Sequence, residues 1–461
     1  MSLFDKYAQV LDTIEPVRYS GEVISVKGLL IESRGPQAVL GEVCTIEIPR
    51  NSNSIMAEVI GIQDTIIQLM PYQEPEGIEV GCRVVATGNP LQAPVSDMLL
   101  GRVIDSLGRP ADGKGPLQID GTYPVFNTPP DALQRNVITE QLQTGVRVID
   151  GLSAVGKGQR LGIFAGSGVG KSTILSMIAR NTNADINVIA LIGERGREVR
   201  EFVENDLGEE GLARSVVIVS TSDTPALARL RGGYVATAVA EYFRDQGKDV
   251  LLLFDSVTRF AMAQREIGLT RGEAPASRGF TPSMFAELPR LLERTGNSDV
   301  GSITGFYTIL VEGDDMNEPV SDTVRGILDG HIVLSRSLAE KYHYPAVDAL
   351  ASLSRLANKV TEPEMQQAAG KIRRLLAVYR DAEDLINVGA YHVGSNPDID
   401  AAIQLLPQIN DFLRQGVFEE SRIPQVKYTM QQITGIKIPG AEPPEPEETP
   451  GHRVSAEAPH A

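Results

Sequence analysis

The sequence predicts an α/β protein in which a mainly parallel sheet is preceded by a small β-barrel and followed by a helical domain. Three patterns predict this fold. Short β-rich runs recur between residues 20 and 88, strand and helix patterns alternate between residues 145 and 348, and helical periodicity dominates after residue 344. Strands that alternate with helices are typical of a parallel sheet covered on both faces.

We expect four regions along the 461 residues: an N-terminal helix and barrel over 1–90, a connector with the α/β core over 91–344, a helical domain over 345–440 and a tail over 441–461. The tail carries five glutamates against one arginine, and five prolines in 21 residues. This composition predicts a disordered acidic extension.

The N-terminal region opens with an apolar stripe at helical spacing, made of Leu3, Phe4, Tyr7, Val10, Leu11 and Ile14. Such a helix either docks on the protein's own body or captures a partner helix, and the stripe leaves both open. Five short runs separated by glycine, proline and asparagine predict the barrel, at 21–26, 43–48, 55–62, 65–69 and 83–86.

Residues 89–130 are rich in glycine and proline and predict a connector wrapped on the core. The core strands are expected at 160–164, 187–192, 215–220, 250–254 and 301–311, with a long helix over 224–246. The C-terminal helices are expected at 362–379, 380–385 and 399–415.

Composition excludes several classes of protein. A net charge of −17 argues against a broad nucleic-acid surface, and no apolar stretch is long enough to span a bilayer. The cysteines, Cys44 and Cys82, lie far apart on strand-like runs, which favours reduced core thiols in a cytosolic protein. The five histidines are scattered and form no ligand cluster.

The run over 162–173 predicts a phosphate-binding loop between a buried strand and a helix. Its glycines let backbone N–H groups surround an anion, and the helix N-terminus adds partial positive charge. Lys171 is expected to reach the β- and γ-phosphates of a nucleoside triphosphate, and Ser172 to take a place on Mg²⁺. Ala165 replaces the usual first glycine. The loop residues expected to hold phosphate are Gly166, Ser167, Gly168, Val169, Gly170, Lys171, Ser172 and Thr173.

Two carboxylates at strand ends complete the expected chemistry. Asp255 ends an apolar strand, where a carboxylate lies beside the phosphate loop and anchors a metal. Glu194 follows the strand over 187–192 and is the candidate to polarise the attacking water. Arg195 and Arg197 are expected to keep it ionised or to pair with Glu198 instead. By itself, such a charged cluster is more often a solvated loop than a catalytic site.

These residues carry a family resemblance. The runs at 148–152, 155–159, 255–261 and 311–319 and the phosphate loop resemble the catalytic subunits of rotary-type hexameric ATPases. They are most similar to the export ATPases of bacterial type III secretion, particularly the flagellar branch, whose phosphate-loop motif also has alanine at the position of Ala165. The resemblance extends to residues 26–32 and 384–400. It implies a RecA-like P-loop ATPase core with an N-terminal barrel and a C-terminal helical domain.

The resemblance also implies roles. Lys171 and Ser172 bind phosphate and Mg²⁺, Asp255 supports the metal through water, and Glu194 is the catalytic carboxylate. Arg195 and Arg259 lie on the γ-phosphate side, and Tyr344 stacks on adenine with Phe418 completing that pocket. Arg355 is the arginine finger that enters a neighbour's site. The loop over 272–283 faces the central pore, although a plain connection is an equal alternative.

We therefore expect a cytoplasmic, Mg²⁺-dependent ATPase that forms a homohexamer and energises or gates flagellar protein export at the cytoplasmic face of the inner membrane. The implied partners are a regulator, a stalk, membrane gate proteins, export substrates and chaperones, with no nucleic acid. Alternatives are an injectisome ATPase, the catalytic subunit of a proton-coupled ATP synthase, a ring-shaped RNA translocase and a non-enzymatic nucleotide-binding scaffold.

Overall fold

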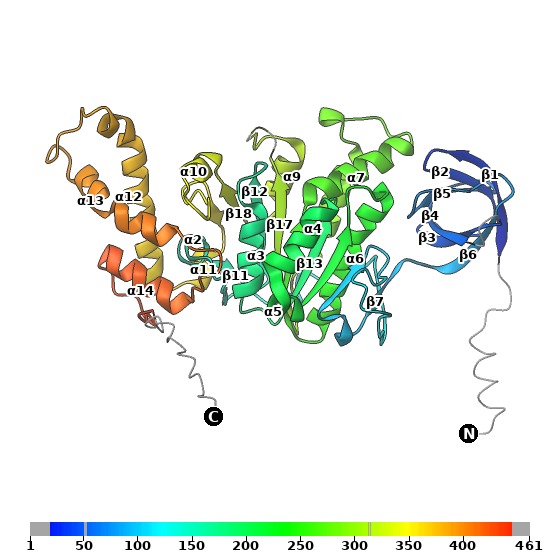
Figure 1. The fold of residues 1–461 in the computed structure, drawn as a ribbon, viewed down its shortest axis with the longest axis horizontal. Coiled ribbons are helices and arrows are strands. Elements are labelled where there is room, and N and C mark those ends of the chain that lie inside the picture. Colours follow the sequence, from blue (N-terminus) through cyan, green and yellow to red (C-terminus); the bar gives the residue numbers. More distant parts are fainter. Residues whose placement is uncertain (1–18, 50–52, 312, 314, 445–461) are drawn as a thin grey trace, which may run out of the picture.

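The computed structural model of the chain describes residues 19–49, 53–311, 313 and 315–444. The chain forms three parts in a row, with a β-barrel at one end, an α/β domain in the middle and a helical domain at the other end (Figure 1). The apolar stripe expected within the first 18 residues and most of the acidic tail lie outside the described residues. Among the described residues, no helix has both the length and the apolar character needed to cross a membrane.

The N-terminal part is a closed barrel with the strand order β1-β2-β5-β4-β3-β6, which confirms the expected barrel. Its strands are β1 (Ser20–Lys27), β2 (Leu30–Arg34), β3 (Glu42–Ile48), β4 (Asn53–Gln63), β5 (Ile66–Pro71) and β6 (Arg83–Pro90). Strand β2 was not predicted, because only the two-residue turn that begins at Gly28 separates it from β1. Cys44 and Cys82 are buried in the barrel and unbridged, as expected.

A buried ion pair joins the barrel to the α/β domain. Arg231 donates through Nε to Glu58 Oε2 at 2.8 Å, and Tyr72 donates to the same oxygen at 2.7 Å. Glu58 belongs to the barrel, and Arg231 to the long helix of the α/β domain. Removing either partner would leave the other as an uncompensated buried charge, so this pair ties the orientation of the barrel to the core.

The central sheet has the strand order β19-β18-β12-β17-β15-β13-β14-β8, with β16 paired to β17. Strands β18 to β8 along this order are parallel, and β19 and β16 are antiparallel to their neighbours, which confirms a mainly parallel sheet. The strands are β8 (Arg102–Asp105), β12 (Arg160–Ala165), β13 (Ile186–Ile192), β14 (Ser215–Ser220), β15 (Asp249–Asp255), β16 (Gly296–Asn297), β17 (Ser302–Leu310), β18 (Gly330–Leu334) and β19 (Leu353–Ser354).

Helices cover both faces of this sheet, so alternate residues of a strand enter different cores (Figure 1). Leu252 and Phe254 pack in one apolar cluster, whereas Leu251 and Leu253 pack in the other. The helical elements of the α/β domain are η1 (Asp97–Leu99), α2 (Arg147–Leu152), α3 (Lys171–Asn181), α4 (Gly196–Glu201), η2 (Phe202–Leu207), α5 (Gly208–Ala213), α6 (Ala226–Asp245), α7 (Val257–Thr270), η3 (Ser277–Gly279), α8 (Pro282–Leu292), α9 (Pro319–Ile327) and α10 (Arg336–Glu340).

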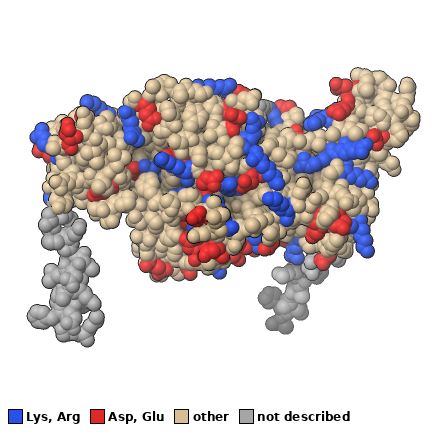
Figure 2. Space-filling view, turned by 180° about the vertical axis from the view of Figure 1, so that it is seen from behind, with Lys and Arg blue, Asp and Glu red and all other residues tan. Residues whose placement is uncertain are grey.

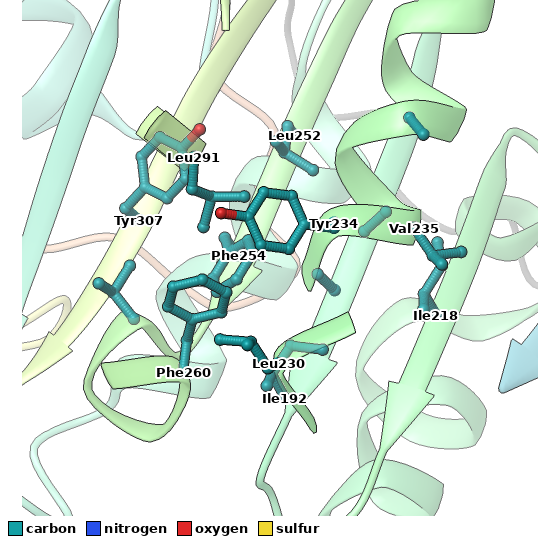
Figure 3. Packing of buried hydrophobic residues seen from close by; sticks show 14 of the residues in the cluster. Ile192, Ile218, Leu230, Tyr234, Val235, Leu252, Phe254, Phe260, Leu291 and Tyr307 are labelled. Atoms are coloured by element: carbon teal, nitrogen blue, oxygen red, sulfur yellow. The ribbon is translucent and has the colours of Figure 1, made fainter. Parts of the chain in front are cut away.

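The first of these cores is built around aromatic rings beneath α6. Tyr234 of α6 meets Phe260 of α7 edge to face, and Phe254 of β15 contacts both Phe260 and Tyr307 (Figure 3). Edge-to-face pairs add about 0.5–1.5 kcal/mol beyond the area they bury. The rigid packing fixes the strand ends on which the functional side chains lie.

The connector contributes more to the core than the sequence analysis predicted. Its strands β7 (Gln92–Val95) and β9 (Gly121–Pro124) pair with each other, but β8 between them joins the central sheet beside β14. The strand β8 lies between glycine-rich turns. Its four residues are too few for an alternation of apolar and polar side chains to predict a strand. Two further short strands, β10 (Gln141–Leu142) and β11 (Val155–Gly156), pair at the start of the domain.

The C-terminal part is helical, as expected, and comprises α11 (Ala357–Val360), α12 (Pro363–Asn387), α13 (Pro397–Leu413) and α14 (Ile423–Thr434). The prediction of separate helices over 362–379 and 380–385 was wrong, because α12 continues through Tyr379 and Arg380. Neither residue is a glycine or proline that would end a helix. Helix α14, whose N-terminal turn contains Pro424, was not predicted either.

Candidate active site

The phosphate loop lies where the sequence places it, between the carboxyl end of β12 and the start of α3. Gly168 and Gly170 have φ values of 77° and 95°, which side chains other than glycine adopt at a cost. Ser167 and Gly168 are exposed, whereas Val169 is buried and anchors the loop. No side chain caps the N-terminus of α3, so its first N–H groups remain available to an anion.

The structure brings Lys171 together with both predicted carboxylates. Lys171 Nζ lies 2.5 Å from Asp255 Oδ1 and 3.2 Å from Glu194 Oε1. The side chains of Lys171 and Glu194 are about equally shielded, and that of Asp255 is only 5% exposed. Three residues far apart in the sequence thus form one charged cluster at the carboxyl edge of the sheet, where ligands bind in parallel sheets.

Burial and charge act against each other at this cluster. Burial lowers the pKa of Lys171, but the charges of Asp255 and Glu194 outweigh burial and raise it overall, so the ammonium form is favoured. Burial and the nearby charge of Asp255 raise the pKa of Glu194, and Lys171 only partly offsets this. Glu194 is therefore a stronger base than an exposed glutamate.

Strand ends position the two carboxylates. Asp255 is the last residue of β15, and Glu194 follows β13 after Gly193. Gly193 has a φ of 74°, and a Cβ at this position would lie 2.7 Å from Cβ of Arg259. Only glycine therefore allows the Arg259 side chain of α7 to approach this turn so closely.

The predicted arginines occupy different surroundings. The side chain of Arg195 is 77% exposed and donates to Glu198 at 3.1 Å, so it faces solvent next to the cluster without joining it. Arg259 is half-buried on α7 beside Gly193. Ser172 is exposed and Thr173 half-buried in the first turn of α3.

A hollow of about 490 Å³ lies beside the phosphate loop, and Tyr344 lines it together with Arg147, Phe412, Gln415 and Glu419. The Tyr344 ring lies close to the loop, because a Cβ at Gly170 would be 3.8 Å from its Cε1. Tyr344 is 41% exposed and presents an aromatic surface. The hollow therefore provides aromatic rings and several polar groups next to the place of the phosphates.

Phe418 is not among the residues that line this hollow. Its ring lies 4.8 Å from the guanidinium carbon of Arg180, at the end of α3, and the side chain is 76% exposed. The structure therefore brings Phe418 near α3 but does not place it in contact with Tyr344.

Sequence reasoning missed a hydrogen bond between two residues that line the hollow, Arg147 and Gln415. The backbone N–H of Arg147 donates to Gln415 Oε1 at 2.8 Å, and Gln415 Nε2 donates to the carbonyls of Gly145 and Glu419. Because Arg147 and Gln415 are 268 residues apart, no local pattern could have revealed the pair.

Arg355 lies far from the Lys171 of its own chain. It follows β19 at the amino end of β12, where its N–H donates to the carbonyl of Asp329 at 3.0 Å and its side chain is exposed. The phosphate loop lies at the other end of β12, roughly 16 Å away by the rise of a six-residue strand. Within one chain, Arg355 and Lys171 therefore occupy opposite edges of the sheet.

The loop that the sequence analysis associated with a pore follows α7 and leads into α8. It contains η3, and Arg278 within it has a φ of 47° and pairs with Asp315 at 3.0 Å.

Over the face shown in Figure 2, acidic and basic side chains are interspersed in the central part of the molecule.

The oxygen donors of the site suit magnesium. Across the described ranges, no group of three or more histidine, cysteine or acidic side chains could hold a metal ion on its own. Mg²⁺ commonly takes only one or two protein ligands together with substrate phosphates and water. Asp255 supplies a carboxylate and Ser172 an exposed hydroxyl in the first turn of α3, next to the phosphate loop.

Comparisons with known proteins follow the same three parts of the chain. Residues 145–354 match the nucleotide-binding domain of the ATP synthase alpha/beta family, and residues 23–88 match the family's beta-barrel domain. A flagellum-specific ATP synthase of Treponema pallidum is 56% identical over 96% of this chain and 98% of its own length. The chain belongs to the ATP synthase alpha/beta family.

The C-terminal part narrows the assignment. Residues 361–432 match the C-terminal domain of the type III secretion ATPase EscN. The structure of assembled EscN from enteropathogenic E. coli superposes with a TM-score of 0.85 at 44% identity, covering 90% of this chain and 99% of EscN. A second EscN structure, in complex with its central stalk EscO, has a TM-score of 0.83 at 43% identity with the same coverage. The chain is thus an ATPase of the flagellar and type III secretion class.

Proposed function

We propose that this chain is the cytoplasmic ATPase of a flagellar protein export apparatus and hydrolyses ATP in the cluster formed by Lys171, Glu194 and Asp255. The observation that carries the proposal is the position of the Lys171 amine between the two carboxylates, directly after the phosphate loop. The match of the C-terminal helices to an export ATPase model favours export over ATP synthesis.

ATP binding changes the partners of Lys171. In the absence of phosphate, its ammonium is neutralised by Asp255 and Glu194. The β- and γ-phosphates compete for the same ammonium with more negative charge, so Lys171 turns from the carboxylates toward them. The open N–H groups of the loop and of α3 hold the remaining phosphate oxygens. Tyr344 stacks on the adenine in the adjoining hollow.

The departure of Lys171 prepares Glu194 for catalysis. Because the Lys171 ammonium lowers the pKa of Glu194, its withdrawal raises that pKa further. Glu194 then accepts a hydrogen bond from the attacking water and orients it in line with the γ-phosphate. Arg259, beside Gly193, contributes positive charge on the same side.

Ser172 and Asp255 would hold Mg²⁺, Ser172 directly and Asp255 through water. When bound, Mg²⁺ neutralises part of the charge that develops on the phosphate oxygens. The protein's own contribution is to keep these two oxygen groups at the edge of the sheet, beside Lys171.

Arg355 completes the site of a neighbouring copy. Because it lies at the opposite edge of the sheet from its own phosphate loop, it serves as an arginine finger only across a subunit interface. One chain carries both Glu194 and Arg355, so every site of a homohexameric ring is competent. A ring also suits a central stalk, the kind of partner named for EscN. The remaining partners we propose are a regulator, membrane gate proteins, chaperones and export substrates at the inner membrane.

A mixing experiment tests the shared site. Glu194→Gln and Arg355→Ala are each expected to release little phosphate. When mixed, a site with intact Glu194 from one chain and intact Arg355 from the other forms at about a quarter of the interfaces of a random ring. Recovery of phosphate release on mixing is therefore expected.

Arg374→Ala is the matched control, because Arg374 is exposed on α12 and, within the described part of the chain, forms an ion pair only with the exposed Asp398. It should retain the activity of the unmodified chain. Full activity of Arg355→Ala alone, or a mixture that stays as inactive as its components, would refute the shared site. Failure of the unmodified chain to bind nucleotide would refute the ATPase proposal itself.

A further inference from the structure

Thr308 makes the closest contact to Asp255 apart from Lys171. Its hydroxyl lies 2.7 Å from Asp255 Oδ1, and the next acceptor, the carbonyl of Phe254, is 3.3 Å away. Thr308 is fully buried near the carboxyl end of β17, next to β15, whose last residue is Asp255. The contact therefore joins two neighbouring strands at the metal-anchoring carboxylate.

We propose that Thr308 is a positioning residue that holds Asp255 in place for the metal when Lys171 turns to the phosphates. This inference rests on the proposed ATPase function. It concerns a residue outside the phosphate loop and the charged cluster, and assigns it a role in the metal dependence of nucleotide binding.

The division of the two Asp255 oxygens supports this role. Oδ1 accepts hydrogen bonds from both Lys171 and Thr308. Among the described residues, no group donates to Oδ2. One oxygen is thus held by the protein, and the other would remain available toward the metal.

Of the two donors to Asp255 Oδ1, only Thr308 keeps its hydrogen bond when phosphate binds. Lys171 leaves when phosphate binds, whereas the Thr308 hydroxyl is buried on a central strand, with Asp255 as its nearest acceptor. The terminal torsion of an aspartate is soft, so a carboxylate that has lost its ammonium partner rotates unless another group fixes it. Threonine is stiff at its first side-chain torsion, which makes it a suitable fixed donor. Partners that orient metal-binding carboxylates typically change metal affinity or activity by about 10–100-fold when removed.

The alternative is that the Thr308 hydroxyl only donates a hydrogen bond to a buried carboxylate and so stabilises the fold. The two roles differ in what metal does to nucleotide binding. A purely structural contact changes stability, and with it binding in the presence and absence of Mg²⁺ alike. A positioning contact changes only the gain in affinity that Mg²⁺ provides.

The test compares Thr308→Val, which removes the hydroxyl at nearly constant shape, with Thr308→Ser, which keeps it. The affinity for a fluorescent ATP analogue is measured with Mg²⁺ and with EDTA, at protein concentrations matched to the fraction folded. We expect the Mg²⁺-dependent gain in affinity to fall about 10-fold in Thr308→Val, while binding in EDTA changes less than about two-fold. Thr308→Ser should restore most of the gain.

Thr304→Val is the matched control. Thr304 lies on the same face of β17, four residues earlier, is equally buried and accepts from the backbone N–H of Gly158 at 2.8 Å. We expect it to lower stability without changing the Mg²⁺-dependent gain. An unchanged gain in Thr308→Val, or equal losses in Thr308→Val and Thr304→Val, would overturn the inference. If the unmodified chain does not bind the analogue with or without Mg²⁺, the proposed function itself fails. If the unmodified chain binds it with the Mg²⁺-dependent gain and Thr308→Val keeps that gain, only the inference about Thr308 fails.

Discussion

Lys171 Nζ lies 2.5 Å from Asp255 Oδ1, so the amine that we propose to bind phosphate and the carboxylate that we propose to anchor the metal neutralise each other in the free protein. The pair joins the first residue of α3 to the last residue of β15. Without Lys171, two acidic side chains would remain partly buried with no compensating ammonium. The contact thus serves the free protein as well as the bound one.

Lys171→Ala is expected to reduce phosphate release about 100-fold or more, because the phosphates lose their main cation. Steady-state phosphate release and nucleotide binding check this, with circular dichroism as a test of folding. Lys157→Ala is the matched control, since Lys157 is equally shielded and pairs with Glu140 and Asp249 away from the phosphate loop. Full activity in Lys171→Ala would contradict the assignment.

Glu194→Gln is expected to bind ATP but to lose about 10²-fold or more in kcat, because a glutamine cannot accept the proton of the attacking water. Burial and Asp255 raise the pKa of Glu194, so the acid limb of kcat/KM should lie at a higher pH than that of an exposed glutamate. Activity therefore rises as pH increases through this raised pKa. Glu201→Gln, on the exposed side of α4, should leave the pH–rate profile unchanged.

Tyr344→Ala should raise KM for ATP about 10-fold with little change in kcat, because stacking of a base on an aromatic ring contributes about 1–3 kcal/mol to binding. Tyr344→Phe keeps the ring and should bind ATP nearly as well as the unmodified chain. Both constants are obtained from initial rates over a range of ATP concentrations. A fall in kcat at unchanged KM would speak against a role in base stacking.

We expect the buried carboxyl group of Asp150 to make the free energy of unfolding depend on pH. It is fully buried and accepts from the N–H and hydroxyl of Thr144 and the N–H of Gly145. Burial raises its pKa from 3.8 to about 7. The folded state therefore keeps a proton that the unfolded state releases, and the free energy of unfolding falls as pH rises from about 4 to about 7.

Asp150→Asn cannot titrate and offers an amide donor where the Gly145 N–H needs an acceptor, so it should destabilise by about 1–3 kcal/mol. The gap in Tm between the unmodified chain and this variant should narrow as pH rises from about 5 to about 7, as thermal melts can show. Asp112→Asn is the control: a hydrogen bond from Arg102 lowers the pKa of Asp112, so its gap should stay constant over this range. A gap that widens with pH in Asp150→Asn would contradict the assignment.

Much of the fold followed from local patterns. The phosphate loop needs glycines at fixed positions, because Gly168 and Gly170 adopt left-handed backbone conformations. The strands that end at Asp255 and before Glu194 are apolar runs long enough to identify. By contrast, β8 is four residues long, and its place in the sheet depends on pairing with β14 more than a hundred residues later.

The sequence by itself determined the parts of this protein whose chemistry is local: the phosphate loop, the strand-end carboxylates and the alternation that produces a parallel sheet. Only the tertiary structure decided that Lys171 bridges both carboxylates, that Thr308 holds Asp255 from the next strand, and that Gln415 supports Arg147. The physical reason is that side chains from separate strands meet only after the sheet has set its strand order and register. Neither order nor register is encoded in any short stretch of the chain.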